Sequence, residues 1–154
     1  MASTRKILAV VPESDTDWKP HPKSTSIGEL ALHLSNIVRW AAFTFDRTEL
    51  DLAPPGGPPF DPPKFKSVAD ALAEFDANVT TGKAAIAAAN DADWMMPWSL
   101  KFGGKTIFTM PRVAVMRSVV MNHMIHHRGQ MTVYLRIRDV KLPGIYGPTA
   151  DEEV

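Results

Sequence analysis

The sequence predicts an all-α fold with one small β-hairpin before the last helix. Three observations support this fold class. Residues 111–138 form one long amphipathic stretch, Ser26 and Ser67 each begin a helix-start motif, and a Gly103-Gly104 pair separates two short apolar runs. With 154 residues, 45% of them hydrophobic, the chain is expected to form one domain over residues 1–154 around a sizeable core.

Charge and composition exclude several function classes. Seventeen basic and seventeen acidic side chains give a formal net charge of zero, which argues against binding to nucleic acid or to an anionic membrane. There are no cysteines, so disulfides, thiolate metal sites and cysteine nucleophiles are excluded. The first residues lack the apolar run of a signal peptide, and no window resembles a membrane span. A cytoplasmic location is therefore the default expectation.

The first half of the chain predicts two helices. A short one runs from Thr4 to Val11 and ends before Pro12. After a proline-punctuated segment, Ser26 and Glu29 match the S-x-x-E capping box, and apolar spacing continues that helix to about Leu52.

His33 is the residue of interest in the second helix. It projects roughly 60° from Leu30, at the flank of the apolar stripe, where a side chain can reach inward. Taken alone, His33 is more simply interpreted as a boundary histidine that makes a hydrogen bond at the surface. His21, which lies between two prolines, is expected to be exposed and has no assigned role.

The middle of the chain predicts a loop, a third helix and the hairpin. Residues 53–64 are too rich in proline and glycine to be helical, and they are interpreted as a stiff connector. Ser67 caps a helix that continues to about Ala89. Residues 99–108, SLKF-GG-KTIF, predict the hairpin, which needs packing to be stable. Four aromatic residues could pack on it or could wall a pocket, and core packing is the favoured interpretation: Trp94, Trp98, Phe102 and Phe108.

The last helix is predicted to run from Pro111 to Arg138. Proline suits the first helical position, where its missing N–H has no partner to lose. Steps at helical spacing give an expected apolar seam: Val113, Met116, Val120, His123, His127, Met131, Tyr134 and Ile137.

Two histidines interrupt this seam one turn apart. At i, i+4 the Cβ atoms of His123 and His127 lie roughly 5–6 Å apart, close enough for both to bind one metal ion. They could instead be core histidines, each with a hydrogen-bond partner. His126 makes His123/His126 a second possible pair, but His127 lies nearer the axis of the seam.

With these residues in hand, the chain resembles the DinB-like (DinB/YfiT) metalloenzyme family. The similar segments are SIGELALHLSNIVRW at 26–40, NHMIHHRGQMTVYLR at 122–136 and the tail LPGIYGPTADE at 142–152. The resemblance implies an up-down-down-up four-helix bundle, frequent homodimers and a divalent metal, Zn²⁺ or Ni²⁺, held by His33, His123 and His127. The segment before Pro12 is shorter than the family's first helix.

Three imidazoles leave at least one coordination position of a metal ion open, which is typical of catalytic sites. A water or a substrate thiol could be activated there. The expected function is therefore a metal-dependent transferase or hydrolase that acts on a small molecule by thiol S-transfer or hydrolysis. The alternative is a non-catalytic metal- or ligand-binding stress protein on the same scaffold. Four residues are candidates to orient the imidazoles: Asn36, Asn122, Gln130 and Tyr134.

Overall fold

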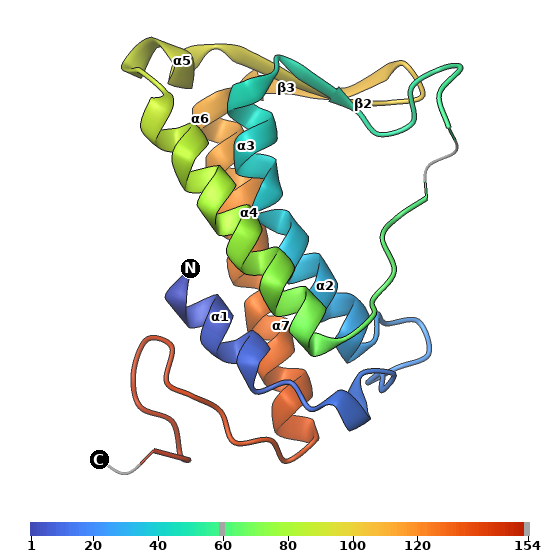
Figure 1. The fold of residues 1–154 in the computed structure, drawn as a ribbon, viewed down its shortest axis with the longest axis vertical. Helices are drawn as coiled ribbons and strands as arrows, with labels where there is room; N and C mark the ends of the chain where they lie inside the picture. The colour runs from blue at the N-terminus through green and yellow to red at the C-terminus, as the bar shows by residue number, and fades with distance from the viewer. Residues whose placement is uncertain (59–60, 153–154) are drawn as a thin grey trace.

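The computed structural model describes residues 1–58 and 61–152, and within them the chain is mostly helical with one three-stranded sheet (Figure 1). The sheet lies at one end of the long helices, and the first helix and the C-terminal tail lie toward the other (Figure 1). The predicted helical character is confirmed, and the sheet has one strand more than the predicted hairpin.

Helix α1 (Ala2–Ala9) is short, as predicted, although it begins two residues earlier than expected. It buries Ile7 and Leu8 completely in the core. The Arg5 guanidinium donates to the Asp76 carboxylate at 2.8 Å, which links this helix to the middle of α4.

Helix α2 (Ile27–Ile37) starts at the predicted capping box: Ser26 Oγ accepts from the Glu29 N–H, and the Glu29 carboxylate accepts from the Ser26 N–H. The prediction of one helix to about Leu52 is wrong. The helix is interrupted at Val38, α3 (Arg39–Asp46) follows, and strand β1 (Glu49–Asp51) begins three residues later. Pairing of β1 with a strand from the second half of the chain overrides the local helical pattern.

Helix α4 (Val68–Ala88) has the predicted bounds, and Ser67 Oγ caps it by accepting from the Asp70 N–H at 3.0 Å. It packs against both α2 and α3. A Cβ at Gly82 would lie 3.3 Å from the Val38 carbonyl oxygen, so glycine permits this close approach. A short helix α5 (Asp91–Met95), capped by Asn90, was not predicted.

Strands β2 (Pro97–Phe102) and β3 (Lys105–Pro111) form the predicted hairpin, and β1 adds to β2 in parallel. Gly103 and Gly104 both have positive φ, 61° and 77°, the backbone that a tight two-residue turn requires. The Asp51 carboxylate accepts from both of their N–H groups. Trp98 is fully buried and donates to the Phe43 carbonyl, so this tryptophan packs the hairpin on α3.

The predicted helix over 111–138 is present but not uniform. It consists of α6 (Arg112–Val115), a π-helical segment η2 (Met116–Asn122) and α7 (His123–Ile137). The π segment has wider turns, so the apolar seam rotates along the helix. Val113 and Ile137, expected in the seam, are therefore 43% and 54% exposed, whereas Val115 and Leu135 are fully buried.

The core lies where α1, α2, α4 and α7 meet. Its fully buried members come from all four helices: Ile7, Leu8, Ile27, Leu34, Phe75, Met131 and Leu135. The tail after α7 is irregular, as expected, and ion pairing of Arg136 with Asp151 holds it to that helix. Within the described part of the chain, no helix combines the length and apolar character needed to cross a membrane.

Because the capping box satisfies two backbone groups at the start of α2, Ser26→Ala is expected to lower the free energy of unfolding by about 1 kcal/mol. Ser14→Ala, at an exposed site, should stay within about 0.5 kcal/mol of the wild type. Urea unfolding at neutral pH measures both. Equal losses for the two variants would contradict the assigned role of the cap.

Candidate metal centre

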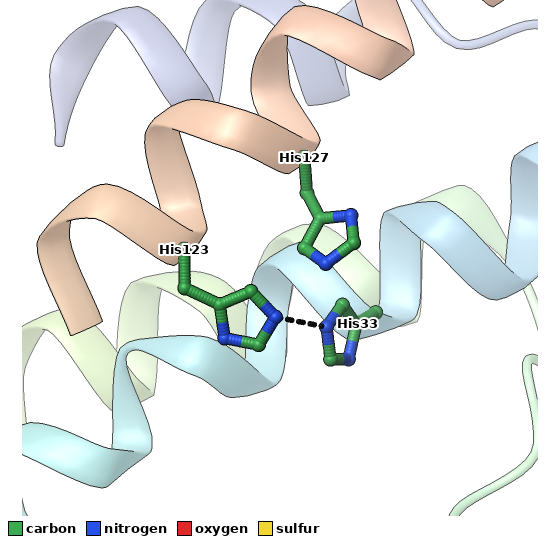
Figure 2. Close-up of side chains that lie close together, drawn as sticks. All are labelled: His33, His123 and His127. Atoms are coloured by element: carbon green, nitrogen blue, oxygen red, sulfur yellow. Dashed lines mark hydrogen bonds between the residues drawn. The ribbon is translucent and has the colours of Figure 1, made fainter. Parts of the chain in front are cut away.

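Three histidines from two helices converge between α2 and α7. His33 comes from α2 and His123 and His127 from α7, and one ring nitrogen of each lies within 4.8 Å of the others. Nε2 of His33 and Nε2 of His123 are 3.2 Å apart. Figure 2 shows the His123 and His127 rings directed from α7 toward His33. The structure thus brings together all three histidines singled out in the sequence.

Buried neighbours on each helix fix this convergence. Leu30 and Leu34, on either side of His33 in sequence, are buried in the core. Met124 and Met131, near the two α7 histidines in sequence, are buried as well. Packing of α2 against α7 therefore determines where the three rings meet.

The hydrogen bond of His127 selects its tautomer. Nδ1–H of His127 donates to Oε1 of Gln130 at 2.6 Å, and an amide oxygen can only accept. The proton is therefore on Nδ1, and Nε2 keeps a free lone pair. Of the four residues proposed to orient the imidazoles, Gln130 is the one that contacts a histidine of the group within the described residues.

His123 has the same arrangement with a backbone partner. Its Nδ1–H donates to the Val119 carbonyl at 3.3 Å. The backbone N–H of His123 bonds to Val120, three residues back, at the end of the π segment. The side chain of His123 thus bonds to the carbonyl that an α-helical N–H would use. Sequence reasoning missed this partner because a backbone carbonyl carries no residue signature.

The other three candidates make different contacts. Asn36 donates its amide to the Leu32 carbonyl on its own helix. Tyr134 is buried with its ring edge against Trp18, 5.8 Å between centroids. Asn122 is exposed at the start of α7. The expectation that these three orient the imidazoles gains no support from these contacts.

The environment keeps the imidazoles neutral. Burial against the other rings, then the charges of His127 and His123, lower the pKa of His33 to about 4, although its outer edge is open to solvent. Burial also lowers the pKa of His123, partly offset by the Val119 carbonyl. Burial lowers the pKa of His127 as well, partly offset by Gln130. Neutral imidazoles are the form that binds metal ions.

The donor set fits a divalent ion. Ligand nitrogens about 2.05 Å from a tetrahedral Zn²⁺ lie about 3.3 Å apart, close to the 3.2 Å between His33 and His123. Two ligands of one ion cannot be more than about 4.2 Å apart at such bond lengths, so the widest nitrogen pair would close slightly on binding. Small rotations of imidazole rings at the open edge of His33 can supply this change.

His126 lies outside the group. Its side chain is exposed, and its ring centroid is 4.8 Å from that of His127. Between the two pairings considered for the last helix, the geometry brings His127, not His126, to His123 and His33. His21 is also exposed and accepts from the Lys23 N–H in the loop before α2.

Met95, Met96 and Trp94, which precede the hairpin, lie away from the histidine group. Met95 and Met96 are exposed at the end of α5, and Met96 sulfur contacts Arg112 beside the sheet. Trp94 packs on Phe45, 4.8 Å between ring centroids. The histidine group is therefore open at the His33 side.

A surface cavity of about 430 Å³ lies between α2 and the start of α4. Leu32, the residue before His33, is part of its wall. Phe65 and Ala71 supply more apolar surface, and Lys66 and Glu74 supply charge. The cavity neighbours the histidine-bearing helix, but the three histidines do not form its walls.

Comparison with known protein families gives a match over most of the chain. A family model described as the DinB superfamily matches residues 2–131. The uncharacterized protein YrdA of Bacillus subtilis (strain 168) is 52% identical over 33 residues, which are 21% of this chain and 20% of that protein. The match thus spans about a fifth of that relative's length.

Two solved structures share the fold. A DinB-like protein from Bacillus cereus ATCC 10987 aligns over 94% of this chain and 89% of its own, with TM-score 0.66 and 23% identity. A DinB-like protein from Bacillus subtilis, YjoA, aligns over 94% and 90%, with TM-score 0.69 and 17% identity. At these identities the likeness concerns the fold alone.

The low pKa of His33 predicts acid sensitivity of the metal-free protein. The unfolded chain, with a histidine pKa of about 6.5, binds more protons than the folded one between about pH 6.5 and 4, so stability falls as the pH falls through that window. His33→Gln should reduce this loss, whereas His21→Gln in an exposed loop should not.

Urea midpoints of chelator-treated protein, at about pH 7 and about pH 4.5, measure the effect. Identical pH dependence in wild type and His33→Gln would show that His33 carries no such shift.

Proposed function

Because the chain belongs to the DinB superfamily, we propose that His33, His123 and His127 hold a divalent metal ion, Zn²⁺ or Ni²⁺, with which the protein acts on a small molecule. The observation that carries this proposal is the convergence of three imidazoles, two of which donate Nδ1–H to acceptors within the chain. Two of them already donate Nδ1–H to fixed acceptors, so their Nε2 atoms carry no proton. In the 3.2 Å contact His33 Nε2–H then donates to His123 Nε2, and His33 must move this proton to bind a metal ion through Nε2.

The number and placement of the ligands support catalysis over a purely structural role. Three protein ligands leave a coordination position open, and the exposed side of His33 gives solvent access to it. A bound divalent ion would lower the pKa of a water or thiol at that position and so supply a nucleophile at neutral pH. All three ligands are neutral, so none of the positive charge of the ion is cancelled by the protein.

Thiol S-transfer is the reaction that the group supports best. In hydrolysis, a base normally removes the proton of the attacking water. The group contains imidazoles only, and all three are used as ligands. A thiol, with a pKa of about 8.5, ionises far more readily than water and needs less assistance. In this transfer the thiol sulfur bonds to an electrophilic carbon, the leaving group departs with its bonding electrons, and the thiol proton goes to solvent.

The alternative is a non-catalytic metal- or ligand-binding protein. The cavity beside α2 favours it, because the walls of this cavity are formed by residues other than the three histidines. On that view the same three ligands retain an ion without turnover.

We also propose a helix arrangement and a cellular location for the protein. Helices α1, α2, α4 and α7 form an up-down-down-up four-helix bundle in one domain that spans residues 1–154. Contacts of α1 with α4 and α7, and of α2 with the same two helices, support this arrangement. The protein is cytoplasmic and acts without nucleic acid or membrane, as its balanced charge suggests.

Single His33→Ala, His123→Ala and His127→Ala variants should each lose the bound metal, because two imidazoles alone bind it weakly. His126→Ala, one residue from a ligand but outside the group, should keep it. Elemental analysis of purified, metal-loaded protein measures the stoichiometry. Normal metal content in His127→Ala together with loss in His126→Ala would show that His126, and not His127, is the ligand.

Metal-loaded wild type should then be screened with low-molecular-weight thiols and electrophiles, and separately with hydrolysable esters and amides. Thioether products that require His123 would support S-transfer. Metal binding without turnover in any assay would support the non-catalytic alternative.

Gln130 tests whether orientation of an imidazole matters. Gln130→Leu removes the acceptor for Nδ1–H of His127 and should weaken metal affinity about 10–100-fold. Gln130→Glu keeps an acceptor at the same reach and should retain the affinity. Competition titration against a chromophoric chelator measures both. Equal affinities in the two variants would mean that the 2.6 Å contact does not position the ring.

A further inference from the structure

A second, smaller pocket lies near the sheet, apart from the three histidines. Its volume is about 150 Å³, and residues from the ends of α3 and α4, from α5 and from the start of α6 form its walls. Figure 1 shows α5, α6 and the end of α4 together at the end of the molecule that carries the sheet. Four elements therefore bring side chains to one place that the proposed metal chemistry does not use.

Arg112, in the wall of this pocket, is buried with one hydrogen-bonding group unused. It is 6% exposed, and within the described residues its Nε is buried without a hydrogen-bond partner. Nη2 donates to the Arg47 carbonyl at 3.3 Å, and Nη1 donates to the Met96 sulfur, a weak acceptor, at 3.8 Å. The Asp93 carboxylate is 3.9 Å from Nη1, too far for a hydrogen bond. Buried N–H groups almost always have a partner, so this guanidinium lacks an acceptor that a ligand can supply.

The other polar groups of the pocket are negative. Asp46 is exposed at the end of α3 and makes no ion pair or hydrogen bond with the part of the chain that the structure describes. Asp93 adds a second carboxylate. Ala85 and Ala88 lie in the last turn of α4, where carbonyl groups without an intrahelical partner carry partial negative charge. Against these groups stands the single positive charge of Arg112, so the pocket favours a ligand that brings a positive charge as well as an acceptor.

The size of the pocket limits the ligand to a few atoms. A water occupies about 30 Å³ in the liquid, so a volume of about 150 Å³ has room for about five non-hydrogen atoms, the size of glycine. The half-buried ring of Phe45 and the alanine methyl groups supply some apolar surface beside the charges. A molecule this small that carries both a carboxylate and an ammonium group is a small amino acid.

We infer that this pocket binds a small zwitterionic amino acid of the size of glycine or alanine. Nε–H of Arg112 donates to the ligand carboxylate, a charge-assisted pairing that suits the guanidinium group. The ligand ammonium group donates to the Asp46 carboxylate and to carbonyl oxygens at the end of α4. A simple carboxylate would meet Asp46 and Asp93 without a cation to offset them, and a simple amine would leave Nε of Arg112 without an acceptor.

The inference does not depend on the proposed function, because the pocket and the histidine group share no residue and amino-acid binding is measured without reference to metal.

An NMR titration of the ¹⁵N-labelled full chain tests the inference. Glycine and L-alanine should cause saturable shifts of the amide signals of Asp46, Asp93 and Arg112, with a Kd on the order of 1 mM. Acetate and methylammonium each carry one of the two charges and should bind at least about 10-fold more weakly. Acetate that binds as tightly as glycine would identify a site for simple anions and would overturn the inference.

Asp46→Asn removes the carboxylate that is expected to accept from the ligand ammonium group. It should raise the glycine Kd at least about 10-fold, and the fold should be retained because the side chain is exposed. Asp17→Asn, an equal change at an exposed residue before α2, is the matched control and should leave the Kd unchanged.

Ala85→Leu fills the pocket with a larger apolar side chain and should abolish glycine binding. Ala84→Leu, at the preceding exposed position of α4 and outside the pocket, should retain it. Circular dichroism and urea midpoints check that each variant is folded. The absence of saturable shifts with either amino acid, or a glycine Kd unchanged by both Asp46→Asn and Ala85→Leu, would show that water alone satisfies Nε of Arg112 and would contradict the proposed site.

Discussion

The packing of α2 against α7 is the constraint on which the candidate site depends. Leu30 and Leu34 on one helix, and Met124 and Met131 on the other, are buried on either side of the three histidines. Burial of these apolar side chains fixes the spacing and rotation of the helices. The imidazoles then meet with 3.2 Å between His33 and His123, although 90 residues separate them in the chain. Hydrophobic packing of α2 against α7 thus positions the histidines, which lie at the edge of this packed surface.

A second set of contacts fixes the tautomers of the imidazoles and keeps them neutral. Gln130 and the Val119 carbonyl hold the protons of His127 and His123 on Nδ1, and desolvation lowers the pKa of all three histidines. The π segment belongs to this layer because it ends where His123 begins. π segments inside α-helices are frequent at functional sites, and here the segment aligns a backbone carbonyl with an imidazole.

The last helix serves two surfaces because its two sides are both apolar. Its core side carries the residues that pack on α1 and α2, and the histidines lie at the margin of that side. Its solvent side carries the exposed side chains of Ile125, Val133 and Ile137.

The sequence by itself determined features that depend on local physics. Ser26 and Ser67 predicted two helix starts because a cap is satisfied by residues three positions away, and Gly103-Gly104 predicted the turn because only positive φ closes it. The placement of His123 and His127 on one face likewise followed from their i, i+4 spacing within a single helix. Tertiary structure alone decided the end of α3, where β1 pairs with a distant strand. It also decided that Val113 and Ile137 lie outside the buried side of the last helix. The convergence of His33 with His123 and His127 likewise depends on tertiary structure. These features depend on contacts between segments that are far apart in the chain, and no local pattern encodes such distances.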